Sequence, residues 1–353
     1  MIPSRALIVF DMDGVLVDVS RSYRETTRLA VRSFFNGAKG EPQLPDPLFS
    51  RQQLTAIKQA GGLNNDWDVT YQIIRLLCRR VIRRPSNASE KTPWQSYRRA
   101  MARWDVAPLA RWLAETQYPL TRLAAEDNGC DTGDDQIPAF YRGDVGSGNI
   151  IKQIFQEIYL GPELFTQTYG FAPALYTGNG LNRQESLMIP SIQLAQLARK
   201  HILAIATGRP AAEAGYALSL FGLNPCFTLV LTLDDCLEAE ARCQKTDGKK
   251  PSLSKPDPFM LDAIAGQIPD LPALRYYVGD MPDDMCAAVR SRAGFTGIGL
   301  TASVADKAGL AEKLRENGAR HVFDTADGLV QFLSAAGEPA SGQGAGTSAT
   351  SNS

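Results

Sequence analysis

The 353-residue sequence predicts an α/β protein with a parallel-sheet core and an inserted, mostly helical domain. Short, continuous apolar runs that end in polar residues are typical of strands buried on both faces of a parallel sheet. Helix-like stretches alternate with these runs in the second half of the chain, which favours a Rossmann-like core. The runs span residues 6–10, 202–206, 226–231, 276–278, 297–300 and 321–323, and the helical stretches include 191–200, 211–221 and 258–265.

The stretch between the first two apolar runs has a different character. Helical apolar patterns cover residues 23–34, 49–59, 69–83 and 150–160. The less regular part, residues 86–148, is open to two interpretations, an extra helical elaboration or a long loop. We expect an α/β core from residues 1–18 and 185–335, an inserted helical cap domain from 19–184, and a disordered, Gly- and Ser-rich tail from 336–353.

The composition is that of a soluble protein that can bury a core, since 44% of its residues are hydrophobic and 21% are charged. A net charge of −1 provides no basic field to attract nucleic acid or an anionic membrane. No stretch approaches the ~18 uninterrupted apolar residues of a membrane span. The six cysteines form no CxxC pair, which favours reduced thiols. We therefore expect a cytoplasmic protein that binds neither nucleic acid nor a membrane.

Two carboxylates, Asp11 and Asp13, directly follow the first apolar run, and Gly14 allows a sharp turn after them. In an extended chain, residues i and i+2 point to the same side, so both carboxylates would face one cavity. Two like charges so close are costly unless a cation neutralises them, and Mg²⁺ is the common cation beside phosphates. The plainer alternative is that the pair forms a turn or caps a helix.

Polar residues also follow later runs. The hydroxyl of Thr207, at a strand-to-helix junction, could bind a phosphate with nearby backbone N–H groups. Lys255 lies at the entrance to a helix, where its ammonium could balance phosphate and carboxylate charge. Asp280 is a candidate metal ligand, with Asp284 or Asp283 beside it. Taken singly, each has a plainer alternative, a helix cap for Thr207 or Asp280 and a solvated side chain for Lys255.

Taken together, these residues resemble a known family. Asp11-x-Asp13-Gly14, then Thr207, then Lys255-Pro256, then Gly279-Asp280-x-x-x-Asp284 resemble the four ordered motifs of the haloacid dehalogenase-like hydrolase superfamily. The resemblance covers residues 5–18 and 185–335. The insertion directly after the first motif is similar to that of the subfamily with a helical cap at this point, as in phosphoglycolate phosphatase-like and β-phosphoglucomutase-like enzymes.

The resemblance implies a role for each motif residue. Asp11 would be the nucleophile that forms an aspartyl-phosphate, and Asp13 would protonate the leaving oxygen and then activate water. Thr207 would bind the phosphoryl oxygens, and Lys255 would stabilise their charge. The implied cofactor is Mg²⁺, held by Asp11, the backbone carbonyl of Asp13, Asp280 and Asp284. An acid at position 13 favours phosphatase or phosphomutase chemistry over dehalogenation.

Two segments are candidates for substrate binding. Thr207 is followed by Gly208 and Arg209, where many relatives have an asparagine. Arg209 would then contact the substrate, or else be an exposed structural arginine. In the insert, a polar stretch with a Trp could hold the organic part of the substrate, namely Asn64, Asn65, Asp66 and Trp67. The alternative is a turn that ends in a helix cap at Asp66 or Asp68.

The sequence thus predicts a Mg²⁺-dependent phosphatase for a small phosphorylated metabolite. A sugar phosphomutase that uses the same aspartates, and a non-catalytic binding protein on the same fold, are the alternatives. The identity of the substrate and the oligomeric state stay open at this point.

Overall fold

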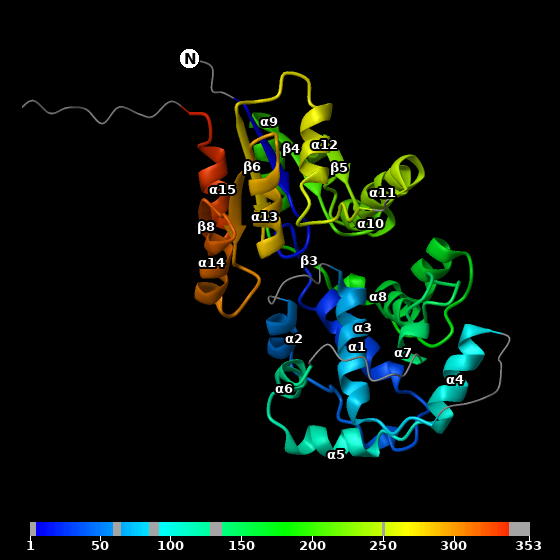
Figure 1. The fold of residues 1–353 in the computed structure, drawn as a ribbon. Coiled ribbons are helices and arrows are strands. Elements are labelled where there is room, and N and C mark those ends of the chain that lie inside the picture. The colour runs from blue at the N-terminus through cyan, green and yellow to red at the C-terminus, as the bar shows by residue number, and fades with distance from the viewer. Residues whose placement is uncertain (1–4, 59–64, 85–91, 128–135, 249–250, 339–353) are drawn as a thin grey trace, which may run out of the picture.

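The computed structural model describes residues 5–58, 65–84, 92–127, 136–248 and 251–338. Figure 1 shows two parts, a sheet flanked by helices and a group of helices beneath it. The two parts are joined close to two short strands, β2 (Val17–Asp18) and β3 (Ser186–Leu187), which pair antiparallel. The chain therefore leaves the sheet and returns to it through adjacent segments.

The core sheet is entirely parallel, with the strand order β5-β4-β1-β6-β7-β8. Its strands are β1 (Ala6–Phe10), β4 (Ile202–Ala206), β5 (Leu229–Leu231), β6 (Leu274–Gly279), β7 (Thr296–Leu300) and β8 (His321–Phe323). All residues of β1 are fully buried, as expected for a central strand that is covered on both faces. The predicted strand over 226–231 is shorter, because Asn224–Cys226 forms a 3₁₀ turn containing Pro225, which has no N–H to donate to a sheet.

Helices cover both faces of this sheet (Figure 1). They are α9 (Ser191–Lys200), α10 (Ala211–Leu220), α11 (Leu233–Asp247), α12 (Phe259–Gln267), α13 (Pro282–Arg290), α14 (Lys307–Glu316) and α15 (Ala326–Ser334). Alternate residues of β1 face opposite sides. Ile8 packs in one apolar cluster with residues of α9 and α15, whereas Leu7 and Val9 pack in another with residues of α12 and α13. This packing fixes the strand whose end carries Asp11.

The insert is helical. Its helices are α1 (Tyr23–Phe34), α2 (Arg51–Lys58), α3 (Asp66–Leu77), α4 (Pro93–Arg103), α5 (Ala107–Glu115), α6 (Pro119–Ala125), α7 (Gln136–Ala139) and α8 (Ile150–Tyr169), with 3₁₀ turns at Glu41–Gln43, Cys78–Arg80 and Leu181–Gln184. Of the two interpretations of residues 86–148, the described parts fit the helical elaboration. The predicted fold class, a Rossmann-like parallel sheet with an inserted, mostly helical cap domain, is confirmed.

Helix α8 is longer than the predicted stretch 150–160. Its axis kinks at Gly161, which has a φ of +73°, and the helix then continues to Tyr169. A Cβ atom at Gly161 would lie 2.5 Å from the backbone nitrogen of Gly180, so a side chain has no room there. Within the described ranges, no helix is long and apolar enough to cross a membrane.

Candidate active site

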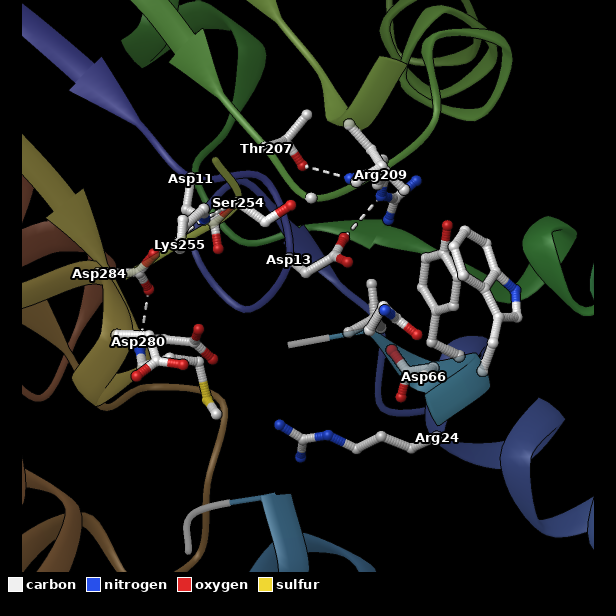
Figure 2. A pocket seen from close by; sticks show the side chains of 18 of the residues that line it. Asp11, Asp13, Arg24, Asp66, Thr207, Arg209, Ser254, Lys255, Asp280 and Asp284 are labelled. Carbon is white, nitrogen blue, oxygen red and sulfur yellow. Dashed lines mark hydrogen bonds and ion pairs between the residues drawn. The ribbon is translucent and has the colours of Figure 1, made fainter. Parts of the chain in front are cut away.

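The motif residues meet at the carboxyl edge of the sheet, where open α/β sheets bind ligands. Asp11 follows β1, Thr207 follows β4, and Asp280 follows β6. They line a pocket between this edge and the insert, shown in Figure 2. The pocket is also lined by Asp13, Gly208, Arg209, Lys255 and Asp284 from the core, and by Tyr23, Arg24, Thr55, Asn65, Asp66 and Trp67 from the insert.

Three buried carboxylates form a cluster in this pocket. One oxygen each of Asp11, Asp280 and Asp284 lies within 4.8 Å of the others, and these residues are only 6%, 5% and 1% exposed. Like charges at this separation repel strongly in a buried site, and a hard divalent cation with oxygen ligands removes the repulsion. Gly14 makes room for the cluster, because a Cβ atom on it would lie 2.0 Å from Oδ2 of Asp280.

Lys255 lies between two of these carboxylates. Its Nζ is 2.7 Å from Oδ1 of Asp11 and 2.8 Å from Oδ1 of Asp284. Burial alone lowers the pKa of Lys255, but the two carboxylates outweigh it, and the pKa is raised well above its usual value. Burial raises the pKa of Asp11 to about 8, and Lys255 opposes this shift, while the neighbouring aspartates add to it. The nucleophile candidate thus needs positive charge nearby to stay ionised.

Asp284 is held in place by several donors. Its Oδ1 accepts hydrogen bonds from Lys255 and from the hydroxyl of Tyr277, each at 2.8 Å. Its Oδ2 accepts one from the backbone N–H of Met281 at 3.0 Å, as part of the capping box that begins α13. The carboxylate therefore orients Lys255 toward Asp11. Tyr277 was not predicted from the sequence, because its ring reads as one more apolar residue of a buried strand.

Asp13 is bound by Arg209. The Nε of Arg209 donates to Oδ1 of Asp13 at 2.6 Å, and its two terminal nitrogens each donate to Glu185 at 3.1 Å. Nη1 also lies 3.2 Å from the hydroxyl of Tyr159. The Arg209 side chain is 1% exposed, so the alternative of an exposed structural arginine is wrong. Arg209 can be buried because the carboxylates of Asp13 and Glu185 bind it from two sides. No local pattern in the sequence indicates these contacts.

A second buried carboxylate, Glu213 on α10, extends this network into the insert. Its oxygens accept hydrogen bonds from the hydroxyl of Tyr23 and, at 2.9 Å, from the side chain of Gln156. Glu185 in turn accepts hydrogen bonds from Ser22 and Tyr159, both at 2.9 Å. Burial raises the pKa of Glu213 to about 7, although the donors oppose the shift. The Arg209 network therefore joins the start of α1, helix α8 and the core.

The predicted substrate segment of the insert is only partly described, since Asn64 lies outside the described residues. Asn65, Asp66 and Trp67 line the pocket. The side chain of Asn65 accepts a hydrogen bond from the backbone N–H of Asp68 at 2.8 Å, so Asn65 is the N-cap of α3. The alternative of a cap at Asp66 or Asp68 is therefore wrong, because α3 begins earlier than the apolar pattern indicates.

Trp67 belongs mainly to the packing of the insert. It is 6% exposed, its ring meets that of Phe155 edge to face, and the Nζ of Lys152 lies 4.5 Å from its centroid. Gly208, by contrast, is an exposed residue of the pocket wall. Whether any of these residues binds substrate stays a prediction.

No protein-family model and no curated protein matches the chain. Solved structures do match. The X-ray structure of a Northeast Structural Genomics Consortium target superimposes with a TM-score of 0.59 at 18% identity, over 94% of this chain and 98% of that chain. Phosphatase Tt82 from Thermococcus thioreducens superimposes with a TM-score of 0.48 at 19% identity, over 88% of this chain and 99% of that chain. A predicted phosphoglycolate phosphatase from Haemophilus somnus superimposes with a TM-score of 0.45 at 16% identity, over 92% of this chain and 96% of that chain.

Identities this low show a shared fold alone, and the first match shows it over nearly the whole of both chains. The class that fold and site define is an α/β protein with a helical cap and a carboxylate-lined pocket between the two. In the order of its four motifs, the chain resembles the haloacid dehalogenase-like hydrolases.

Proposed function

We propose that the chain is a Mg²⁺-dependent phosphatase that hydrolyses a small phosphorylated metabolite through an aspartyl-phosphate on Asp11. The observation that carries this proposal is the convergence of Asp11, Lys255 and the buried carboxylate cluster in one pocket. A nucleophilic carboxylate, a fixed ammonium and a candidate cation site are the parts that phosphoryl transfer uses for positioning and charge stabilisation. The order of the four motifs in the sequence supports the proposal independently, because it resembles that of the haloacid dehalogenase-like hydrolases.

The donor set fits Mg²⁺. Asp11, Asp280 and Asp284 would hold the ion with hard oxygen ligands, joined by the backbone carbonyl of Asp13. When bound, the ion would neutralise carboxylate and phosphate charge. The same positive charge would favour the ionised form of Asp11, whose pKa burial raises to about 8. The fit is therefore chemical as well as geometric.

The protein groups divide the reaction into two steps. A carboxylate oxygen of Asp11 bonds to phosphorus while the ester oxygen leaves, and Asp13 gives that oxygen its proton. Asp13 then takes a proton from water, whose oxygen attacks the aspartyl-phosphate, releases phosphate and restores Asp11. Lys255 and the hydroxyl of Thr207 stabilise the phosphoryl charge in both steps. Arg209 fixes the position of Asp13 through its 2.6 Å hydrogen bond.

The first experiment measures Mg²⁺-dependent phosphate release across a panel of small phosphate esters. Asp11→Asn should reduce release at least ~10³-fold with the fold retained, since it removes the nucleophile. Asp324→Asn is the matched control. Asp324 is exposed and does not line the pocket, so this variant should keep full activity. Trapping of phosphate on the wild-type protein and not on Asp11→Asn would identify the intermediate.

The outcomes separate the alternatives. Release that needs both Mg²⁺ and Asp11 supports the phosphatase. Phosphate that moves between two positions of a sugar, with little release, would instead indicate a sugar phosphomutase. No release, no transfer and no trapped phosphate with any ester would contradict the enzymatic proposal and favour a binding protein. We propose that the binding partner is a small phosphorylated metabolite and that the protein binds neither nucleic acid nor a membrane.

A further inference from the structure

The pocket contains more negative than positive side chains. Among the described residues that line it, the carboxylates are Asp11, Asp13, Asp66, Asp280, Asp283 and Asp284, and the cations are Arg24, Arg209 and Lys255. Two of the cations are engaged with carboxylates. Lys255 bonds Asp11 and Asp284, and Arg209 bonds Asp13 and Glu185. The positive charges of Lys255 and Arg209 are therefore already balanced by carboxylates before any ligand binds.

Arg24 is different. It lies in the first turn of α1 and is half-buried in the pocket wall. In the part of the chain that the structure describes, no hydrogen bond or ion pair joins its guanidinium to another residue. Arg28, one turn further along α1, bonds Glu25 at 2.6 Å, so a nearby arginine of the same helix does find a carboxylate. Five N–H donors of Arg24 are thus left for water or a ligand.

The position of Arg24 separates it from the place of the chemistry. Figure 2 shows its side chain extending from the insert into the cavity, on the side away from Asp11 and Thr207. A phosphoryl group bound at Asp11 and Lys255 would therefore direct the rest of the substrate toward Arg24. Elsewhere in the pocket an additional anion would meet carboxylates, which repel it.

We propose that Arg24 binds a second anionic group of the substrate, a carboxylate or a second phosphate, at the end remote from the transferred phosphoryl group. A guanidinium matches either group with two parallel hydrogen bonds. The inference rests on the proposed phosphatase function and narrows its substrate class to phosphate esters with two anionic ends.

The test uses pairs of esters that differ in the second group. 3-Phosphoglycerate is compared with glycerol 3-phosphate, and fructose 1,6-bisphosphate with fructose 6-phosphate. Wild-type kcat/KM should favour the doubly anionic member of at least one pair by about 10- to 100-fold, the usual effect of a hydrogen bond to a charged group. The first pair reports on a carboxylate and the second on a phosphate. Arg24→Ala should bring the ratio close to one, and Arg24→Lys should restore part of it.

Arg21→Ala is the matched control. Arg21 is exposed and precedes α1, so its loss removes the same charge outside the pocket and should leave the ratio unchanged. A wild-type ratio near one in both pairs, or an Arg24→Ala ratio equal to the wild-type ratio, would overturn the proposal.

Binding to the Asp11→Asn protein, measured by calorimetry with and without Arg24→Ala, keeps this test separate from turnover. If no ester is hydrolysed but the doubly anionic ligand binds more tightly in an Arg24-dependent way, the phosphatase proposal fails and the anion site stands. If the esters are hydrolysed but both members of each pair bind equally, the anion site fails alone. If neither ligand binds, the anion site also fails.

Discussion

Glu185 is the buried partner of Arg209, and its replacement by Gln tests how far the Arg209 network stabilises the protein. The two side chains are 0% and 1% exposed. Gln keeps the shape of Glu but removes its charge, which leaves Asp13 as the only carboxylate bonded to Arg209 among the described residues. Removing one partner of a buried pair costs about 3–5 kcal/mol. Because the carboxylate of Asp13 still pairs with Arg209, we expect the free energy of unfolding to fall by an amount near the lower end of this range, about 3 kcal/mol. This corresponds to roughly a hundredfold change in the unfolding equilibrium constant.

The assay is urea unfolding followed by circular dichroism and by tryptophan fluorescence. All Trp residues lie between positions 67 and 112, so fluorescence reports on the insert and circular dichroism on the whole chain. Glu163→Gln is the matched control, since Glu163 pairs with Arg183 at 3.0 Å but the two side chains are 83% and 57% exposed. Exposed ion pairs contribute little, so this variant should unfold at nearly the wild-type urea concentration.

Two results would refute the reasoning. If Glu185→Gln and Glu163→Gln shift the midpoint equally, burial does not determine the strength of the Arg209 pair. If the transitions of Glu185→Gln separate, so that fluorescence reports unfolding of the insert at a lower urea concentration than circular dichroism reports for the whole chain, the network does not couple the insert to the core.

Two further predictions concern Gly14 and Glu213. Gly14→Ala should weaken Mg²⁺ binding at least ~10-fold, because its Cβ would lie 2.0 Å from Oδ2 of Asp280 and displace that ligand. Gly37→Ala, with φ +85° and no atom within 4 Å, carries only the backbone cost and should leave the Mg²⁺ titration unchanged. Burial raises the pKa of Glu213 from its usual 4.5 to about 7, so the folded state holds this proton more tightly than the unfolded state. The associated stability is fully present below pH 4.5 and is lost as pH rises to about 7, by roughly 3 kcal/mol. Glu213→Gln, compared by unfolding at pH 5 and pH 7, should remove this difference, and an equal pH dependence in both proteins would contradict the assignment.

Much of the core could be predicted from local pattern. The run 6–10 matches β1 and the run 202–206 matches β4, because a strand buried on both faces needs uninterrupted apolar residues. The residues after these strands, Asp11 and Thr207, then meet at one edge because parallel strands end on the same side. Consecutive residues carry the information on strand burial and strand direction, and the sequence therefore predicted both properties well.

The insert was harder to predict. The helices between residues 92 and 127 are only 11, 9 and 7 residues long, and each has a proline at its first or second position, so the sequence there resembles a loop as much as a helix. Helix α8 extends beyond a kink at Gly161, where the chain passes close to Gly180, a contact that the local pattern of residues does not contain. Tertiary packing decided both.

The sequence by itself determined the parallel sheet, the position of the insert and the order of the four motifs, because each is recorded in neighbouring residues. Only the tertiary structure decided the partners of the charged groups. Arg209 lies 24 residues from Glu185 and 196 from Asp13, yet bonds both, while Arg24 bonds no described residue in a pocket full of carboxylates. Charges interact through space and their strength depends on burial, neither of which a linear pattern contains.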